Sequence, residues 1–505
     1  MLWEMTHPEI IFRVCCVKGD HPRGEFVEQA TSALPPAVRG KVHRKVWKSS
    51  MQKGRSYNMK QRLTAAVAAG FALSAFLLTG TPALSAGEIS IKETVSSTLA
   101  YNPTIKAFQE YRQAADYDLK RARSGWMPRV DARAGYGADQ WSGSTSRRTG
   151  RNRDYYDRSE ASLVISQTIW DGMATWYRVE QGESRLESAQ NRLFDNAEGL
   201  ALDAVLAHIE IYRQRRIVAL AELNVKNHKA ILGSQYERQR SGAATMADVT
   251  QTQSRLARTE ASLAESRSAL EVAISNYKRL TGVDAGQVET PASPRDAYPS
   301  LEEALARSQT GNLKVKALQA DIKTAEAQPN LDKSAFHPQI FVEAGPSYSN
   351  RVQDSWDDNG GMAIMLRANW NLFNGGYDWY NVKGSKARAR QSRQELNALY
   401  DSLADETTTT WSQLVSSQEQ AKYFANAVKY STQTRNMYLQ QFNVGQRSLL
   451  DVLDSENELF SSSIQLVTAQ QNVIAAKYRL LTLGGALLAN FDIDRAGLAV
   501  EMADK

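Results

Sequence analysis

Three charged residues follow Gly445 within nine positions and carry the strongest chemical signal in the sequence. Arg447 precedes Asp451 and Asp454, and two acids three positions apart on a helix share one face, where like charges repel. Asp248 is a related acid, because it follows a glycine at the same spacing of six residues as Asp451. Both acids end a hydroxyl-x-x-acid pattern, so helix capping alone explains these two. The chemistry open to this set is ion pairing, capping or attraction of cations.

Residues that support catalysis or metal binding are sparse. After residue 86 the histidines are His208, His228 and His337, and their separations of 20 and 109 residues match no metal-ligand spacing. The sequence contains no Gly-x-Ser-x-Gly motif and no phosphate-binding glycine loop. We therefore expect no enzyme, no metal site and no cofactor.

The first 86 residues predict an export signal. Residues 59–86 begin with basic residues, continue with an apolar run and end in small residues, which is the pattern of a secretory signal peptide. Residues 1–58 precede it and are interpreted as a mis-annotated or disordered leader. Of 61 basic and 55 acidic residues, 12 and 5 precede Gly87, which leaves 49 and 50 in the mature chain. The mature protein is about neutral, so its charge does not predict nucleic-acid binding. Both cysteines, Cys15 and Cys16, fall in the removed part.

The remaining chain is a tandem repeat. Gly242 and Gly445 are 203 residues apart, and the same displacement relates Asp248 to Asp451. We predict a first repeat at 87–290, a linker at 291–299 that contains three prolines, a second repeat at 300–490 and a C-terminal tail at 491–505.

Alternation of apolar and polar residues predicts two strands in each repeat. The alternating segments are Val130–Tyr136, Ala161–Ile169, Ile340–Tyr348 and Ile364–Leu372. Four strands of about ten residues with one apolar face fit the wall of a transmembrane β-barrel, although soluble hairpins alternate in the same way. The polar segments Asp139–Arg158 and Ser349–Gly361 are predicted to be hairpin loops.

Proline-free segments predict very long helices between the strands and the turns. Gly172 to Gly242 and Gly375 to Gly445 each span 70 residues, which is about 100 Å of α-helix. Gly376 extends the second of the two strand-to-helix turns. The return helices carry heptads, so each repeat is predicted to end in an antiparallel helical hairpin. The heptad positions are Leu256, Leu263, Leu270 and Tyr277, then Leu459, Leu466, Val473 and Leu480. Because four strands are too few to close a membrane barrel, we expect the chain to oligomerise.

The region from about 88 to 490 resembles the TolC family of outer-membrane efflux and secretion channels. The resemblance is carried by the duplicated order of elements, by Asn102-Pro103, by the turn from Asn371 to Gly376 and by the Val-Gly-x-x-x-x-x-Asp-Val-Leu-Asp pattern from Val444 to Asp454. It implies a mixed α and β fold, mostly α-helical, in which a long coiled-coil α-barrel is continuous with a transmembrane β-barrel. It also implies a homotrimer whose four strands per chain form one 12-stranded barrel in the outer membrane of a Gram-negative cell, above a periplasmic tunnel of helices.

The same resemblance implies roles for residues at the helix tips. Arg447 and Asp248 would form a latch at the periplasmic gate, together with Phe442, which stands where the family has a tyrosine. Because Phe442 has no hydroxyl, the closed state is expected to depend more on charge pairing. Threefold symmetry would gather Asp451 and Asp454 into a ring of carboxylates that attracts cations. The tip contacts with an adaptor are assigned to Gly242, Ala243, Val444 and Gly445.

The partners implied are a periplasmic adaptor, an inner-membrane transporter of the RND or ABC type, and outer-membrane lipid. The exported substrate is left open between small toxic compounds, such as drugs, bile salts or dyes, and proteins of a type I secretion system. The alternative is a periplasmic coiled-coil adaptor or scaffold that does not span the membrane. Such an adaptor would not need four alternating strands with aromatic residues at their ends.

Overall fold

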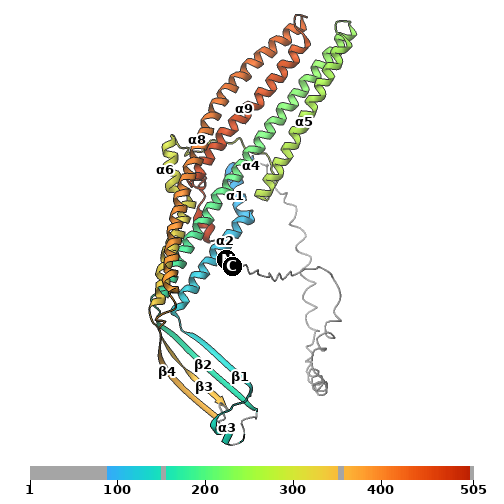
Figure 1. The fold of residues 1–505 in the computed structure, drawn as a ribbon. Coiled ribbons are helices and arrows are strands. Elements are labelled where there is room, and N and C mark those ends of the chain that lie inside the picture. Colours follow the sequence, from blue (N-terminus) through green and yellow to red (C-terminus); the bar gives the residue numbers. More distant parts are fainter. Residues whose placement is uncertain (1–87, 149, 151–154, 351–357, 501–505) are drawn as a thin grey trace, which may run out of the picture. The chain divides into compact units, whose positions relative to one another are not determined.

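A computed structural model of the protein describes residues 88–148, 150, 155–350 and 358–500 (Figure 1). All of them belong to one structural unit, 84–505. The predicted leader and signal peptide lie outside the described residues, as do parts of both predicted hairpin loops.

Helices and strands follow one another in the same order twice along the chain. The first half contains α1 (Ile91–Tyr101), α2 (Pro103–Arg123), β1 (Arg129–Asp139), β2 (Tyr156–Trp170), α4 (Ala174–Arg240) and α5 (Met246–Thr281). The second half contains α6 (Leu301–Gly311), α7 (Leu313–Lys333), β3 (Gln339–Asn350), β4 (Asp358–Asn369), α8 (Tyr377–Asn443) and α9 (Leu449–Leu483). The short elements are η2 (Ser124–Trp126), α3 (Ser144–Arg148), η3 (Ser334–Phe336), α10 (Leu487–Asn490) and α11 (Arg495–Val500).

The longest elements are α4 and α8, with 67 residues each. At 1.5 Å per residue each is about 100 Å long, as the proline-free segments predicted. Each packs against its return helix, α4 against α5 and α8 against α9, and α4 also packs against α9. None of the described helices is apolar enough over a sufficient length to cross a membrane.

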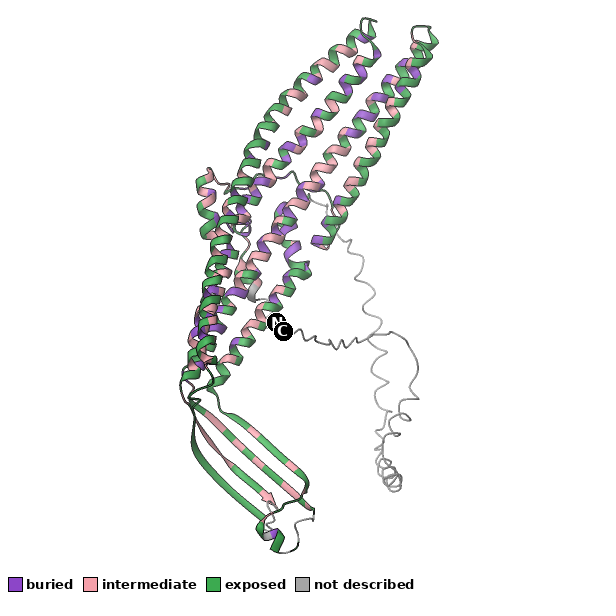
Figure 2. Ribbon diagram, viewed as in Figure 1, coloured by how far each residue is buried: buried purple, intermediate pink, exposed green. Residues whose placement is uncertain are grey.

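The predicted heptads lie in the seams of these hairpins. Tyr277 and Leu480, at the ends nearer the strands, are buried, and the other heptad side chains are half-buried. Buried positions follow the facing sides of the helices along their length (Figure 2). A narrow seam of this kind covers only part of each helix surface.

Nearer the strands, four helices form one layer in the order α2, α4, α7, α8, since each packs against the next. Two short helices lie on this layer, α1 against α4 and α6 against α8. A large apolar cluster joins these parts, and it includes Val95 of α1, Ala201 and Val205 of α4, Leu481 of α9 and Leu488 of α10. This core joins the helical hairpins to the helices that lie next to the strands.

The four strands form one antiparallel sheet in the order β1, β2, β3, β4. Val130 pairs with Ile165, Ile165 with Ala344, and Ala344 with Ile364, so an apolar row crosses all four strands. The opposite face carries most of the charged side chains. Ion pairs on that face join Arg129 to Asp131, Arg158 to Asp139 and Glu160, and Arg367 to Glu343.

Two details of the strands differ from the sequence prediction. The fourth strand ends at Asn369, before the predicted Leu372, because Asn369 pairs with Gln339, the first residue of β3. The Trp370 indole, just beyond the strand, donates to the Phe336 carbonyl oxygen at 3.1 Å. Both hairpin loops are shorter than predicted, because Asp139 pairs with Tyr156 and Asn350 pairs with Asp358 across the sheet.

Candidate gate at the helical hairpin tips

Both helical hairpins turn through the same backbone motif. Gly242 has φ of 77° and its N–H donates to the Gln239 carbonyl, while the N–H of Ala243 donates to the Arg238 carbonyl at 2.8 Å. These two bonds define a Schellman motif, which needs a left-handed residue where the helix ends. Gly445, with φ of 78°, ends α8 through the same pair of bonds. The two tips therefore share one geometry, and they differ only in their side chains.

Asp248 caps the helix at the first tip. The Thr245 N–H donates to the Asp248 carboxylate at 2.9 Å, and the Asp248 N–H donates back to the Thr245 hydroxyl at 3.3 Å. This is the reciprocal capping box that the sequence indicates. The hydrogen bond from the Thr245 backbone, and then that from its hydroxyl, lower the pKa of Asp248. Asp248 is thus held as a carboxylate within its own hairpin.

Asp451 makes a different set of bonds at the second tip. Its N–H donates to the Ser448 hydroxyl at 3.2 Å, but its carboxylate lies 3.6 Å from the Arg447 guanidinium. The guanidinium also stacks over the Tyr438 ring, 4.1 Å from the ring centroid. Arg447 is thereby held between α8 and α9, with its charge beside Asp451.

Phe442 is buried between the two hairpins. Its side chain is 5% exposed and packs with Ile231 of α4 and with Leu449 and Val452 of α9. Arg238 of α4 lies over the ring, 4.5 Å from its centroid, and donates to the Phe442 carbonyl oxygen at 3.0 Å. A phenyl ring at this position therefore joins the hairpins by packing, without a hydroxyl.

Charged contacts also join the two hairpins below the tips. Asp454 of α9 pairs with Arg255 of α5 at 3.0 Å. Glu456, which is 4% exposed, pairs with Arg435 at 3.3 Å and accepts a hydrogen bond from the Asn227 amide of α4 at 3.1 Å. In the single chain, the carboxylate of Asp454 thus has a cation beside it.

Comparison with known proteins identifies the family. The sequence profile described as outer membrane efflux protein matches residues 94–283 and 301–486. The chain belongs to the outer membrane efflux protein family. Members of this family are channel proteins and not enzymes, and the location of the protein is the outer membrane.

Curated members of the outer membrane efflux protein family match most of the chain. The outer membrane efflux protein BepC of Brucella suis is 24% identical over 439 residues, which cover 86% of this chain and 92% of that protein. The outer membrane protein TolC of Vibrio cholerae is 22% identical, with coverage of 81% and 94%. The proteases secretion protein PrtF of Dickeya chrysanthemi is 21% identical, with coverage of 82% and 92%.

Solved structures share the fold of this outer membrane efflux protein. The outer membrane protein VceC of Vibrio cholerae matches with a TM-score of 0.65 at 16% identity, over 79% of this chain and 95% of that one. A membrane protein of Pseudomonas aeruginosa matches with a TM-score of 0.69 at 14% identity, over 78% and 90%. At these identities the likeness concerns the fold alone.

The strand-to-helix turns of this efflux protein use glycines with positive φ. Gly172 has φ of 67°, and a Cβ on it would lie 2.7 Å from the Ser334 carbonyl oxygen. Gly375 and Gly376 have φ of 69° and 86°, and no atom lies within 4 Å of the position of a Cβ on Gly375. The first turn is therefore fixed by a close approach between the two repeats.

The structure places the predicted gate residues in different surroundings. Arg447 and Asp451 meet within the second hairpin, whereas the carboxylate of Asp248 accepts hydrogen bonds from Thr245. The latch between Arg447 and Asp248 and the carboxylate ring remain predictions about assembled copies. Sequence reasoning missed Arg238 and Arg255.

A sequence signal for Arg238 exists. It stands four residues before the first tip glycine, while Phe442 stands three residues before the second. Because the two hairpins lie side by side, residues that are equally far from their turns lie at the same height along the helices and can contact one another. Arg255 has no comparable sequence signal. Whether it lies beside Asp454 depends on how α5 and α9 are rotated relative to each other about their axes.

Proposed function

We propose that the protein is a homotrimeric channel that connects the periplasm to the outside of the cell. The observation that carries this proposal is the open four-stranded sheet. β1 and β4 are its edges and have no neighbouring strand among the described residues, and no residue of the four described strands is buried. Exposed edges of 11 and 12 residues favour pairing with another chain. Three copies joined edge to edge would give 12 strands.

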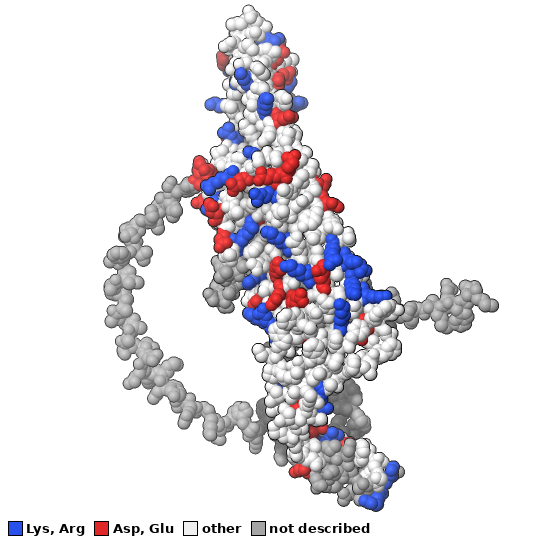
Figure 3. Space-filling model, turned by 90° about the vertical axis from the view of Figure 1, so that its left-hand side faces the viewer, with Lys and Arg blue, Asp and Glu red and all other residues white. Residues whose placement is uncertain are grey.

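The two faces of the sheet support insertion into a membrane. The apolar row of Val130, Ile165, Ala344 and Ile364 would face lipid, and the ion-paired face would line the lumen. Uncharged surface dominates the strands in Figure 3, while charged side chains gather over the helices. The strands would therefore cross the membrane, and the helices would form a periplasmic tunnel.

The helical hairpins would bring the channel to its partners. Helices of about 100 Å reach deep into a periplasm, and their half-buried seams leave surface for neighbouring copies. We propose that the tips contact a periplasmic adaptor coupled to an inner-membrane transporter of the RND or ABC type. The cargo would be small toxic compounds, secreted proteins, or both. Family membership and outer-membrane location favour this conduit over a periplasmic adaptor.

Gating is proposed to occur at the tips. Arg447, Asp451 and Asp454 belong to the second hairpin, and three copies would bring nine such charges around one axis. The closed state would use Arg447 against the Asp248 of a neighbouring hairpin. The Asp451 and Asp454 carboxylates would favour cations in the pore once they are released from Arg447 and Arg255. Phe442 would hold the two hairpins of each chain together during this movement.

Fractionation and bilayer recording together test the proposed function. The protein should sediment with outer membranes, need detergent for extraction, and form cation-preferring channels after reconstitution. Recovery in the soluble periplasmic fraction would contradict the proposal. So would a purified, folded protein that gives no conductance in planar bilayers.

A further inference from the structure

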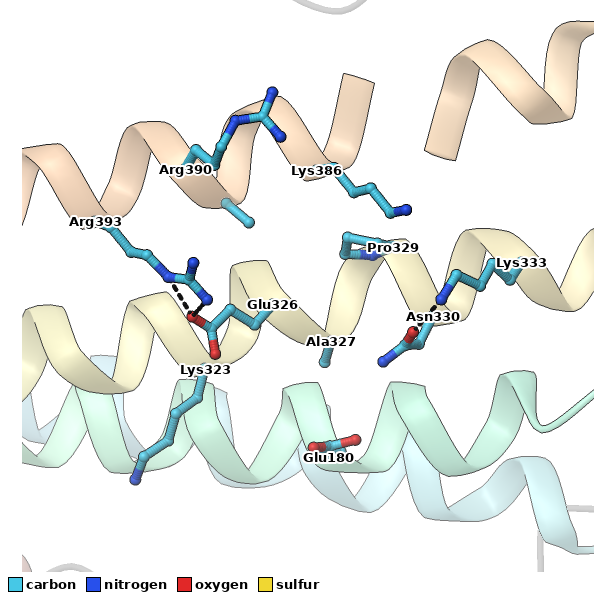
Figure 4. Close-up of a pocket in the computed structure, with 11 residues that line it drawn as sticks. Glu180, Lys323, Glu326, Ala327, Pro329, Asn330, Lys333, Lys386, Arg390 and Arg393 are labelled. Carbon is cyan, nitrogen blue, oxygen red and sulfur yellow. Dashed lines mark hydrogen bonds and ion pairs between the residues drawn. The ribbon is translucent and has the colours of Figure 1, made fainter. Parts of the chain in front are cut away.

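A groove between α7 and α8 lies next to the strand-to-helix junction (Figure 4). Its volume is about 600 Å³, and Pro329, inside α7, forms part of its wall. Lys333 on the rim of the groove is six residues before β3, and Lys386 is nine residues after the start of α8. The groove therefore begins where the sheet ends.

Positive charge dominates this groove. Its basic side chains are Lys323, Lys333, Lys386, Arg390 and Arg393, and its acidic ones are Glu180 and Glu326. Arg393 pairs with Glu326 at 2.6 Å, and Lys323 pairs with Glu187 at 2.8 Å. The remaining charges are three cations and the exposed carboxylate of Glu180.

The three remaining cations lack an acidic partner. Within the residues that the structure describes, Lys386 and Arg390 make no ion pair, and Lys333 donates to the side-chain oxygen of Asn330 at 2.9 Å. All three are exposed. Three cations and one carboxylate leave an excess of positive charge in the groove, and this excess favours a bound anion.

The first repeat shows that the fold itself does not require these cations. Glu183 and Glu187 occupy the positions 203 residues before Lys386 and Arg390. In that repeat, Arg123 of α2 pairs with Glu183 at 2.9 Å. The helices also pack more closely there, since a Cβ on Gly182 would lie 3.1 Å from Leu119. Before the strands the two repeats are displaced by 210 residues, so Leu119 of α2 occupies the position of Pro329 in α7. The open, basic groove belongs to the second repeat.

The groove opens on the side of the helical layer that bears α6. Leu414 packs beneath Ala304 of α6. Arg393 and Lys386 precede Leu414 by three and four heptads, which places them within about 60° and 80° of Leu414 around α8. In the proposed tunnel this side is the outer surface, because α6 on the inside would obstruct the bore. The cations would then face the surroundings of the channel.

Exposed aromatic residues at the strand-to-helix junction indicate that a membrane interface lies near the groove. Trp370, Tyr377 and Trp379 are 59%, 68% and 51% exposed at the junction, and such rings are enriched where membrane meets water. The Lys383 ammonium lies 3.4 Å from the Trp379 ring centroid. Lys386 and Arg390 lie about two and three helical turns beyond Trp379, and their long side chains can extend back toward the lipid headgroups.

We propose that the groove binds the phosphate of an anionic phospholipid headgroup in the periplasmic leaflet of the outer membrane. This site rests on the proposed outer-membrane channel. Lys333 and Lys386 would contact the phosphate from the two helices, and the Arg390 guanidinium would donate two parallel hydrogen bonds. Zwitterionic lipids bind less well, because their own cation is repelled by the same side chains.

Native mass spectrometry of delipidated, full-length trimer titrated with phosphatidylglycerol tests the site. The variant Lys333→Gln/Lys386→Gln/Arg390→Gln removes the three charges and keeps good helix formers. The matched control Lys226→Gln/Arg258→Gln/Lys422→Gln removes three exposed charges elsewhere on the helices. We expect phosphatidylglycerol to bind at least about tenfold more weakly to the groove variant than to wild type or control. The affinity for phosphatidylcholine should differ far less between the groove variant and the other two proteins.

Equal phosphatidylglycerol affinity in wild type and the groove variant would overturn the proposal. Glycerol phosphate that binds as tightly as the lipid would instead assign the groove to a free anion. If the triple variant does not assemble, Lys386→Glu/Arg390→Glu replaces it, because α4 carries these acids at the matching positions.

Conductance of each preparation in phosphatidylcholine bilayers distinguishes the proposed lipid site from the proposed channel function. Active channels without lipid preference refute the lipid site alone, whereas absence of channels throughout refutes the proposed function.

Discussion

Asp248 and Asp451 occupy equivalent positions of the two repeats but make different bonds. Asp248 closes a capping box with Thr245, while Asp451 lies beside Arg447. The residue at the position equivalent to Arg447 in the first repeat is Ala244. The presence of Arg447 therefore places a cation beside Asp451 that Asp248 lacks in the first repeat, and it makes the second tip the candidate for gating.

Replacing Arg447 tests the proposed latch. We expect Arg447→Ala to raise single-channel conductance at least about twofold, because the closed tips lose a cation that holds them together. Planar-bilayer recording of the reconstituted protein gives the measurement. Arg240→Ala is the control, since Arg240 is an exposed arginine at the other tip that pairs with Glu237. Equal conductance in wild type and both variants would leave local pairing with Asp451 as the whole role of Arg447.

Asp248 needs a separate comparison, because it also caps α5. Asp248→Asn removes the charge and keeps an oxygen able to cap the helix, while Thr245→Ala weakens the cap and keeps the charge. If Asp248 belongs to the latch, Asp248→Asn raises conductance and Thr245→Ala does not. The reverse order would identify the cap, and not the charge, as the contribution of Asp248.

At the scale of elements, the strand-to-helix turns connect the sheet to the helices. Gly172 and Gly375 both have positive φ, so a side chain at either position costs roughly 1–2 kcal/mol. Only Gly172 faces a close backbone neighbour, the Ser334 carbonyl. Comparing substitutions at the two positions therefore distinguishes the cost of backbone strain from the cost of a steric clash.

We expect Gly172→Ala to lower the thermal stability of the assembled protein clearly more than Gly375→Ala. A Cβ at Gly172 must displace α7 or η3, whereas a Cβ at Gly375 enters open space. Heat-dependent dissociation followed by gel electrophoresis in detergent measures the difference. Equal effects would show that positive φ alone explains both glycines.

His208 joins several elements at the middle of α4. Its ring contacts the Thr94 hydroxyl and the Glu289 carbonyl oxygen, each at 3.0 Å, and Thr94 in turn contacts the Tyr277 hydroxyl at 3.1 Å. Burial lowers the pKa of His208. The unfolded chain accepts this proton at a pH of about 6.5 and the folded chain only below it, so folding loses stability as the pH falls.

The expected result is a fall in apparent unfolding temperature between about pH 7 and pH 5 that the His208→Gln variant reduces. One proton contributes at most about 1.4 kcal/mol per pH unit. Circular dichroism melts at several pH values measure the slope, with the exposed His337→Gln as the control for loss of an imidazole. An unchanged slope in His208→Gln would exclude this group as its origin.

At the scale of the whole molecule, the parts of the fold set by local pattern were predictable. Alternation predicted the apolar face that includes Val130 and Ile364, and the absence of proline predicted α4 and α8. Contacts between distant segments were not predictable. The region beyond residue 490 was described only as a tail, yet Phe491 stacks on Tyr478 and Arg495 pairs with the buried Glu198.

The candidate site divides in the same way. Glycine spacing and hydroxyl-x-x-acid patterns located both turns and their acids, because capping depends on residues a few positions apart. The burial of Phe442 under Arg238 and the pairing of Asp454 with Arg255 depend on how two hairpins are rotated against each other. Such rotation depends on packing along the whole helices, and a single sequence does not specify it.

Edge-to-edge joining of β1 and β4 between copies is the central claim, and disulfide trapping tests it most directly. Because Cys15 and Cys16 precede the predicted mature chain, introduced cysteines would be its only thiols. Ala132→Cys in β1 is combined in turn with Met362→Cys, Ile364→Cys and Leu366→Cys in β4, which lie on the same face of the sheet.

After oxidation in isolated outer membranes, non-reducing electrophoresis should show covalent dimers and trimers for at least one pair, and no larger species. Each single cysteine variant should remain monomeric. Crosslinks that extend into a continuous ladder, or a complete lack of crosslinks in folded protein across all three pairs, would contradict the closed trimeric channel.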